Sequence, residues 1–172
     1  MKIVDKLVEI IAPHTIRGSA IEYGSAPEAL HGNSLFDYEV NNWKVICLQP
    51  DKNCFEELRI FRRFARHLNC DGGGCPTIDE AISMINLEDI QILLIKNTPD
   101  PLPVIQGFSL ERRNTQIVCV QQNENYPSRA ELTIYLKSRG YNFLERVLVS
   151  DIYVRSKDHR NGLHFSESIF EV

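Results

Sequence analysis

Short apolar runs alternate with segments of helical periodicity along most of this chain, and this alternation constrains the fold more than any other feature. Runs 19–23, 43–48, 90–95 and 116–120 have the lengths and flanking turn residues that are typical of buried strands. Strands that alternate with helices favour a parallel sheet covered on both faces. We therefore expect an α/β fold, a Rossmann-like and mostly parallel sheet flanked by helices.

The helices are predicted from apolar residues at spacings of three and four. Segment 55–68 carries such a pattern after Asp51, which we expect to be its N-cap, and a shorter helix is expected at 77–85. The helix 128–140 has a capping-box pair in Ser128 and Glu131 and a C-terminal glycine. Because proline removes a backbone donor, we expect the loop with Pro99, Pro101 and Pro103 to be irregular.

The N-terminal end of the chain is assigned to a single domain, and the C-terminal end is assigned to a tail outside it. Segment 1–13 is expected to open the domain with an amphipathic helix. Runs 142–149 and 151–155 predict an antiparallel C-terminal hairpin. With no marked shift in composition, one domain is expected over residues 1–156, followed by a polar tail at 157–172.

Charge and composition exclude several classes of function. The net charge of −4 provides no basic field for a nucleic acid, so no nucleic-acid partner is expected. No apolar run approaches the roughly 20 residues that cross a bilayer, and the N-terminus lacks a signal-peptide pattern. Five cysteines, with Cys47 and Cys119 inside strand-like runs, indicate free thiols and a cytoplasmic protein.

A ligand site is expected where the first strands end. In open parallel sheets, ligands bind beyond the carboxyl ends of the strands, near the point where the strand order reverses. The turns at 22–28 and 49–53 occupy this position, and Gly24 permits a tight bend there. A single glycine is also compatible with an ordinary turn.

Several segments of the chain resemble the FkbM-type methyltransferases in order and spacing, over roughly residues 20–155. They are 21–25 (IEYGS), 33–36 (NSLF), 43–51 (WKVICLQPD), 55–58 (FEEL), 77–80 (TIDE), 105–108 (IQGF), 136–141 (LKSRGY) and 151–154 (DIYV). The resemblance implies a class I enzyme that transfers a methyl group from S-adenosylmethionine to a hydroxyl of a sugar or another small molecule.

The same resemblance implies a cofactor site. Glu22, Gly24 and Ser25 fall where the family meets the methionine end of the cofactor, and Gln49 falls where the family has a glutamate for the ribose. A glutamine offers one acceptor and one donor group, so ribose binding would be weakened. The expected cofactor-binding residues are Glu22, Tyr23, Gly24, Ser25, Gln49 and Asp51.

Two further departures concern the acidic segment and the third strand. Where the family has an Asp-Val-Glu-Gly-like segment, this chain has 96–99 (KNTP). In addition, only residues 69–76 separate the two predicted helices, so a strand of the family is expected to be missing there. Lys96 is the only candidate for a catalytic base, and the alternative is a solvated lysine at a strand end. A catalytically inactive binding or scaffold module of the same fold is therefore the rival of the enzyme.

Two other groups of residues allow a functional and a plain interpretation. His67, Cys70 and Cys75 have the chemistry of zinc ligands, but the spacing matches no known zinc motif and ordinary thiols are favoured, so no metal is expected. Four arginines at helical spacing form either an anion-binding stripe or the solvated face of an amphipathic helix, and the solvated face is favoured. They are Arg59, Arg62, Arg63 and Arg66.

Overall fold

A computed structural model describes residues 18–25, 35, 38–39, 42–69, 77–83, 87–121 and 129–156 of the chain. The expected N-terminal helix at 1–13 and the tail at 157–172 lie outside the described residues. None of the described helices is long and apolar enough to cross a membrane.

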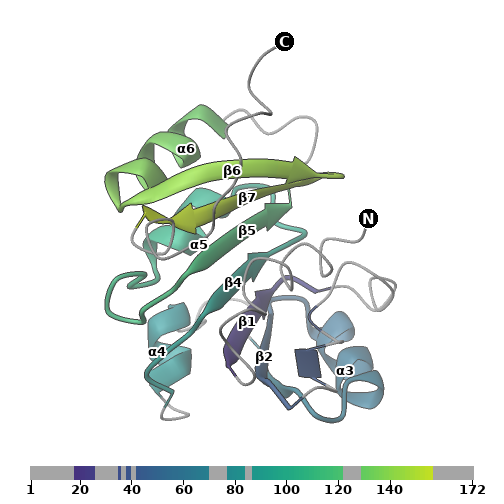
Figure 1. The fold of residues 1–172 in the computed structure, drawn as a ribbon. Coiled ribbons are helices and arrows are strands. Elements are labelled where there is room, and N and C mark those ends of the chain that lie inside the picture. The colour runs from purple at the N-terminus through teal and green to yellow at the C-terminus, as the bar shows by residue number, and fades with distance from the viewer. Residues whose placement is uncertain are drawn as a thin grey trace.

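The described strands form one seven-stranded sheet with the order β3-β2-β1-β4-β5-β7-β6 (Figure 1). Strands β1 to β5 pair in parallel, and β7 pairs antiparallel with both β5 and β6. The strands are β1 (Ser19–Tyr23), β2 (Lys44–Gln49), β3 (Arg66–Asn69), β4 (Ile92–Ile95), β5 (Ile117–Gln121), β6 (Tyr141–Val147) and β7 (Ser150–Arg155). The expected Rossmann-like sheet and its antiparallel C-terminal hairpin are both confirmed.

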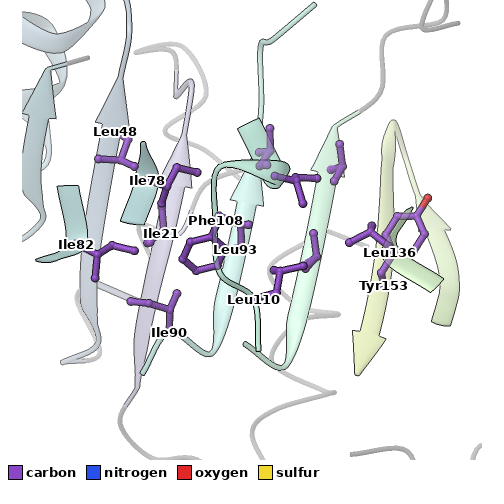
Figure 2. Close-up of a cluster of buried hydrophobic side chains, with 14 of the residues drawn as sticks. Ile21, Leu48, Ile78, Ile82, Ile90, Leu93, Phe108, Leu110, Leu136 and Tyr153 are labelled. Atoms are coloured by element: carbon purple, nitrogen blue, oxygen red, sulfur yellow. The ribbon is translucent and has the colours of Figure 1, made fainter. Parts of the chain in front are cut away.

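One face of the sheet is buried under three helices, α4 (Ile78–Ser83), α5 (Pro101–Gln106) and α6 (Arg129–Ser138). Figure 2 shows the apolar side chains of this face, where Ile82 of α4 and Leu136 of α6 lie over the strands. Successive strand residues point to opposite faces, so Ile21 faces this cluster while Ala20 belongs to the second cluster. The parallel strands are therefore buried on both faces, as their continuous apolar sequences require.

Helix α3 (Lys52–Phe61) is shorter than the sequence pattern predicted. The apolar spacing continues through Leu68, but the helix ends at Phe61 and residues 66–69 form β3 beside β2. The expectation of a 55–68 helix is therefore wrong, and so is the expectation that a strand is missing before residue 77. Tertiary contacts of the turn decide this, because the Glu39 carboxylate accepts hydrogen bonds from the backbone N–H groups of Phe64 and Ala65.

The proline-rich segment is also ordered differently from the prediction. Instead of an irregular loop, Pro101–Gln106 forms α5, with Asp100 as N-cap and a hydrogen bond from Leu102 N to Asp100 Oδ1 of 3.0 Å. The first turn of a helix tolerates proline because its N–H groups have no intrahelical acceptor. Both Pro101 and Pro103 fall within that turn.

Two predicted helix termini are confirmed. Asp51 is the N-cap of α3, and its carboxylate accepts a hydrogen bond from Cys54 N at 2.8 Å. Gly140 follows α6 with a φ of +82°, the left-handed conformation expected of a C-terminal glycine. The buried thiols of Cys47 and Cys119 are free, as expected of small apolar residues in β2 and β5.

Candidate functional site

The carboxyl ends of β1, β2 and β4 meet at Gly24. Its backbone has a φ of +74°, and its N–H donates to Leu48 O of β2 at 2.9 Å. On the other side, the Asn97 side-chain amide donates to Gly24 O at 2.9 Å. A Cβ atom at this position would lie 2.0 Å from Lys96 O, so only glycine fits. This glycine therefore joins the ends of three neighbouring strands at the switch in strand order.

Glu22, at the end of β1, is fully buried and takes part in two ion pairs. Its Oε2 accepts hydrogen bonds from Arg62 Nη1 at 2.7 Å and from Leu35 N at 3.0 Å. Its Oε1 lies 3.4 Å from Lys96 Nζ. The carboxylate that the family resemblance places at the cofactor's methionine end is thus engaged by two cations of this chain.

Glu39 completes a buried cluster of four charged side chains. Its Oε2 accepts from Arg62 Nε at 3.0 Å, while its Oε1 holds the turn after α3. Glu22, Glu39, Arg62 and Lys96 are each at most 5% exposed, and their two negative and two positive charges balance. We call these four residues the buried charge cluster.

The electrostatics of this cluster favour ionised Glu22. Burial by itself raises the pKa of this carboxyl, but the positive charges of Arg62 and Lys96 and the hydrogen bonds that it accepts outweigh burial. The pKa of Glu22 therefore lies below its ordinary value. A charged carboxylate is stable in this interior only because both cations are present.

Gln49, at the end of β2, uses both ends of its side-chain amide within the chain. Its Nε2 donates to Ser25 O, and its Oε1 accepts from Asp51 N at 2.9 Å. The side chain is only 4% exposed. A glutamate here would lack the donor for Ser25 O, so the glutamine matches this local geometry and ties the first two strand-to-helix turns together.

The other predicted cofactor residues lie around the same strand ends. Ser25 is buried beside Gln49, and Tyr23 is partly buried and packs against the cluster under α4 to α6. Asp51 is exposed, and its carboxylate serves as the N-cap of α3. The structure therefore brings the six predicted residues together, with Glu22, Gln49 and Asp51 engaged in internal contacts.

Lys96 differs from the expectation of a solvated lysine at a strand end. The residue is 1% exposed, and its ammonium group faces Glu22 inside the buried charge cluster. A general base must reach a proton on the acceptor. At this position, the described contacts of Lys96 Nζ are directed into the interior.

The predicted arginine stripe does not exist, because the helix on which it depends ends at Phe61. Arg62 is fully buried, which contradicts both the anion-binding stripe and the solvated face for this residue. Arg66 lies on β3, and only Arg59 of the four is on α3. The role of Arg62 was missed because its spacing from the other arginines carries no sign of inward orientation.

The suggested metal ligands are only partly described. His67 lies on β3, and its Nε2 contacts Arg62 O at 2.7 Å. Cys70 and Cys75 lie outside the described residues. Among the residues that the structure describes, no three His, Cys, Asp or Glu side chains gather as metal ligands would.

Comparison with known proteins supports the fold and no finer relationship. No family model matches the sequence, and no curated protein is similar to it at a significant level. Among solved structures, the methyltransferase domain of METTL16 is similar with a TM-score of 0.62 and 12% identity, over 89% of this chain and 66% of that domain. This chain therefore spans just under two thirds of that domain.

Two further solved structures are comparable. Fibrillarin of Aeropyrum pernix, solved with natively bound S-adenosylmethionine, has a TM-score of 0.56 and 14% identity over 87% of this chain and 74% of its own. A precorrin 8W decarboxylase of Methanobacterium thermoautotrophicum has a TM-score of 0.60 and 14% identity over 88% of both chains. The chain thus has the Rossmann-like fold of class I S-adenosylmethionine-dependent methyltransferases. At such identities, the likeness concerns the fold alone.

Proposed function

We propose that this chain is a binding module with the methyltransferase fold, and that it does not transfer methyl groups. The observation that carries the proposal is the internal use of Glu22 and Gln49. These are the two side chains that the FkbM resemblance assigns to the methionine and ribose parts of the cofactor.

The cost of freeing these side chains supports the proposal. To bind the ammonium group of S-adenosylmethionine, the Glu22 carboxylate would have to give up its ion pair with Lys96 or Arg62. The released cation would then be buried without its partner. Breaking a buried ion pair costs about 3–5 kcal/mol. The Gln49 amide would also have to leave Ser25 O and Asp51 N to bind the ribose hydroxyls. Both costs reduce the affinity for the cofactor.

The second candidate is methyl transfer from S-adenosylmethionine to a hydroxyl of a sugar or another small molecule, as in the FkbM type. The feature that favours it is the intact turn at Gly24, where the ends of β1, β2 and β4 meet at the switch in strand order. In this candidate, Tyr23, Gly24, Ser25, Gln49 and Asp51 would border the cofactor with Glu22. Lys96 would act as the base after leaving Glu22. The free buried thiols support a cytoplasmic location in both candidates.

Calorimetric titration with S-adenosylmethionine, and separately with S-adenosylhomocysteine, distinguishes the two candidates. We expect no saturable heat up to millimolar ligand from protein whose thermal unfolding is cooperative. Saturable binding at micromolar concentrations would contradict the binding module and support the enzyme.

A variant pair identifies the site if binding is seen. Gln49→Ala should then weaken binding, whereas Gln106→Ala, an exposed glutamine at the end of α5, should not. Substitution of Gly24 is unsuitable for this purpose, because any Cβ there overlaps the backbone oxygen of Lys96, just after β4. Loss of binding in such a variant would report a displaced strand.

A further inference from the structure

Three large apolar side chains are exposed within five residues at the end of α3. Ile60 is 64% exposed, Phe61 56% and Phe64 77%. We call these three residues the α3 patch. Single exposed apolar residues are common, and three large ones so close together in the chain are the starting point for an interaction surface.

The buried charge cluster holds the α3 patch outward. Arg62, which lies between Phe61 and Phe64 in the chain, is fully buried and pairs with Glu22 and Glu39. The Glu39 carboxylate fixes the turn itself through the N–H groups of Phe64 and Ala65 at 2.9 and 2.8 Å. The exposure of the two phenylalanines is therefore set by buried contacts, and the surface is preorganised for binding.

Charge is distributed unevenly about this patch. Before Ile60, the exposed Glu56 and Arg59 pair with each other at 3.3 Å, and the exposed Glu57 lies between them in the chain. The exposed Arg63 and Arg66 follow Ile60. Glu57 and Arg63 lie three residues before and after Ile60, and neither has an ion-pair partner in the described part of the chain. Apart from the Glu56–Arg59 pair, the charge close to Ile60 is thus negative at Glu57, before it in the chain, and positive at Arg63 and Arg66, after it.

We propose that the α3 patch is the contact surface of a homodimer. Two copies of α3 would pack antiparallel about a twofold axis near Ile60, with the α3 patches in the centre and Glu57 of each copy facing Arg63 of the other. A twofold contact requires a surface that is complementary to itself, and the two-sided charge pattern meets this requirement. A purely anionic partner would pair with Arg63 and Arg66 but would be repelled by Glu57.

Sedimentation velocity over a concentration series tests the proposal on the full chain. We expect a species with twice the 19.8 kDa mass of the chain that dissociates on dilution. Phe64→Asp should abolish it, since its side chain is the most exposed of the α3 patch and its backbone contact to Glu39 is retained. Ile134→Asp is the matched control, because Ile134 is 69% exposed on α6 and should leave the dimer intact.

A charge exchange tests the register of the two helices. Glu57→Lys and Arg63→Glu should each weaken the dimer about tenfold by facing like charges, and the double variant should restore it. If the double variant dimerised no more tightly than the single variants, the proposed packing would be overturned. A chain that is monomeric at all concentrations would overturn the dimer. The dimer would also be overturned if the monomer bound a single-stranded oligonucleotide or polyglutamate through Phe64, because the surface would then serve an anionic partner.

Discussion

Arg62 Nη1 donates to Glu22 Oε2 at 2.7 Å, although the two residues are 40 positions apart and neither side chain is exposed. The contact joins the end of α3 to the end of β1. Together with Glu39, it determines where α3 stops and how the chain turns towards β3. A link between a helix end and a strand end thus replaces the longer helix that the apolar spacing predicted.

Loss of Arg62 should destabilise the protein strongly. Arg62→Met leaves Glu22 and Glu39 as buried carboxylates without their shared cation, and we expect a loss of about 3–5 kcal/mol in the free energy of unfolding. Urea denaturation measures this change. Arg66→Met, at an exposed position on β3, should change it by less than about 0.5 kcal/mol. Equal effects of the two substitutions would contradict the anchoring role of Arg62.

Gly24 and Gly140 should respond differently to alanine. Both have a left-handed backbone, with φ of +74° and +82°, so each variant carries strain of about 1–2 kcal/mol. At Gly140, nothing lies within 4 Å of the new Cβ, whereas at Gly24 it would lie 2.0 Å from Lys96 O. We therefore expect Gly24→Ala to cost at least about 4 kcal/mol, from steric overlap added to the strain. Similar midpoints of thermal unfolding for the two variants would be incompatible with the close approach of Gly24 to the Lys96 backbone.

The carboxyl group of Glu22 should titrate below its ordinary pKa. Because the folded-state pKa is lowered, the stabilisation is complete above the unfolded pKa of about 4.5 and is lost as the pH falls through the folded value. The carboxyl carbon chemical shift of Glu22, followed by NMR from pH 7 downward, measures this pKa directly. A pKa above 4.5 would mean that burial outweighs the charges of Arg62 and Lys96.

Asp151 should be the main ionic contact of the C-terminal hairpin. Its fully buried carboxylate accepts from Arg129 Nε at 2.9 Å and from Arg146 Nε at 2.7 Å, and joins α6 to β6 and β7. We expect Asp151→Asn to cost about 2 kcal/mol, because two charge-assisted hydrogen bonds lose their anion.

The matched control for this prediction is Glu111→Gln. Glu111 lies 3.5 Å from Arg139, and both side chains of this pair are about half exposed. Solvent screens such a pair, so a change below about 0.5 kcal/mol is expected. Urea denaturation of both variants compares the free energies of unfolding lost at the buried and at the exposed carboxylate. A larger loss at Glu111 would contradict the role of Asp151 as the main ionic contact of the hairpin.

Much of the candidate site could be predicted from the sequence, because its backbone depends on local signals. A glycine after a strand and an aspartate before a helix identified the turns at Gly24 and Asp51, and the structure has both. The interior partners of Glu22 and Gln49 could not be predicted. Arg62, Lys96 and Ser25 meet them through the packing of segments that are far apart in the chain, and no local pattern encodes those contacts.

Apolar periodicity and turn residues were enough to predict the alternation of strands and helices, the parallel sheet and the edge at which the carboxyl ends of its strands meet. Tertiary structure alone decided that Phe61 ends α3, that 66–69 is a strand, and that Arg62 and Lys96 are buried. The physical reason is that a charged side chain enters an interior only when distant residues supply its counter-charges. Glu22 and Glu39 become available to Arg62 only after the sheet has assembled.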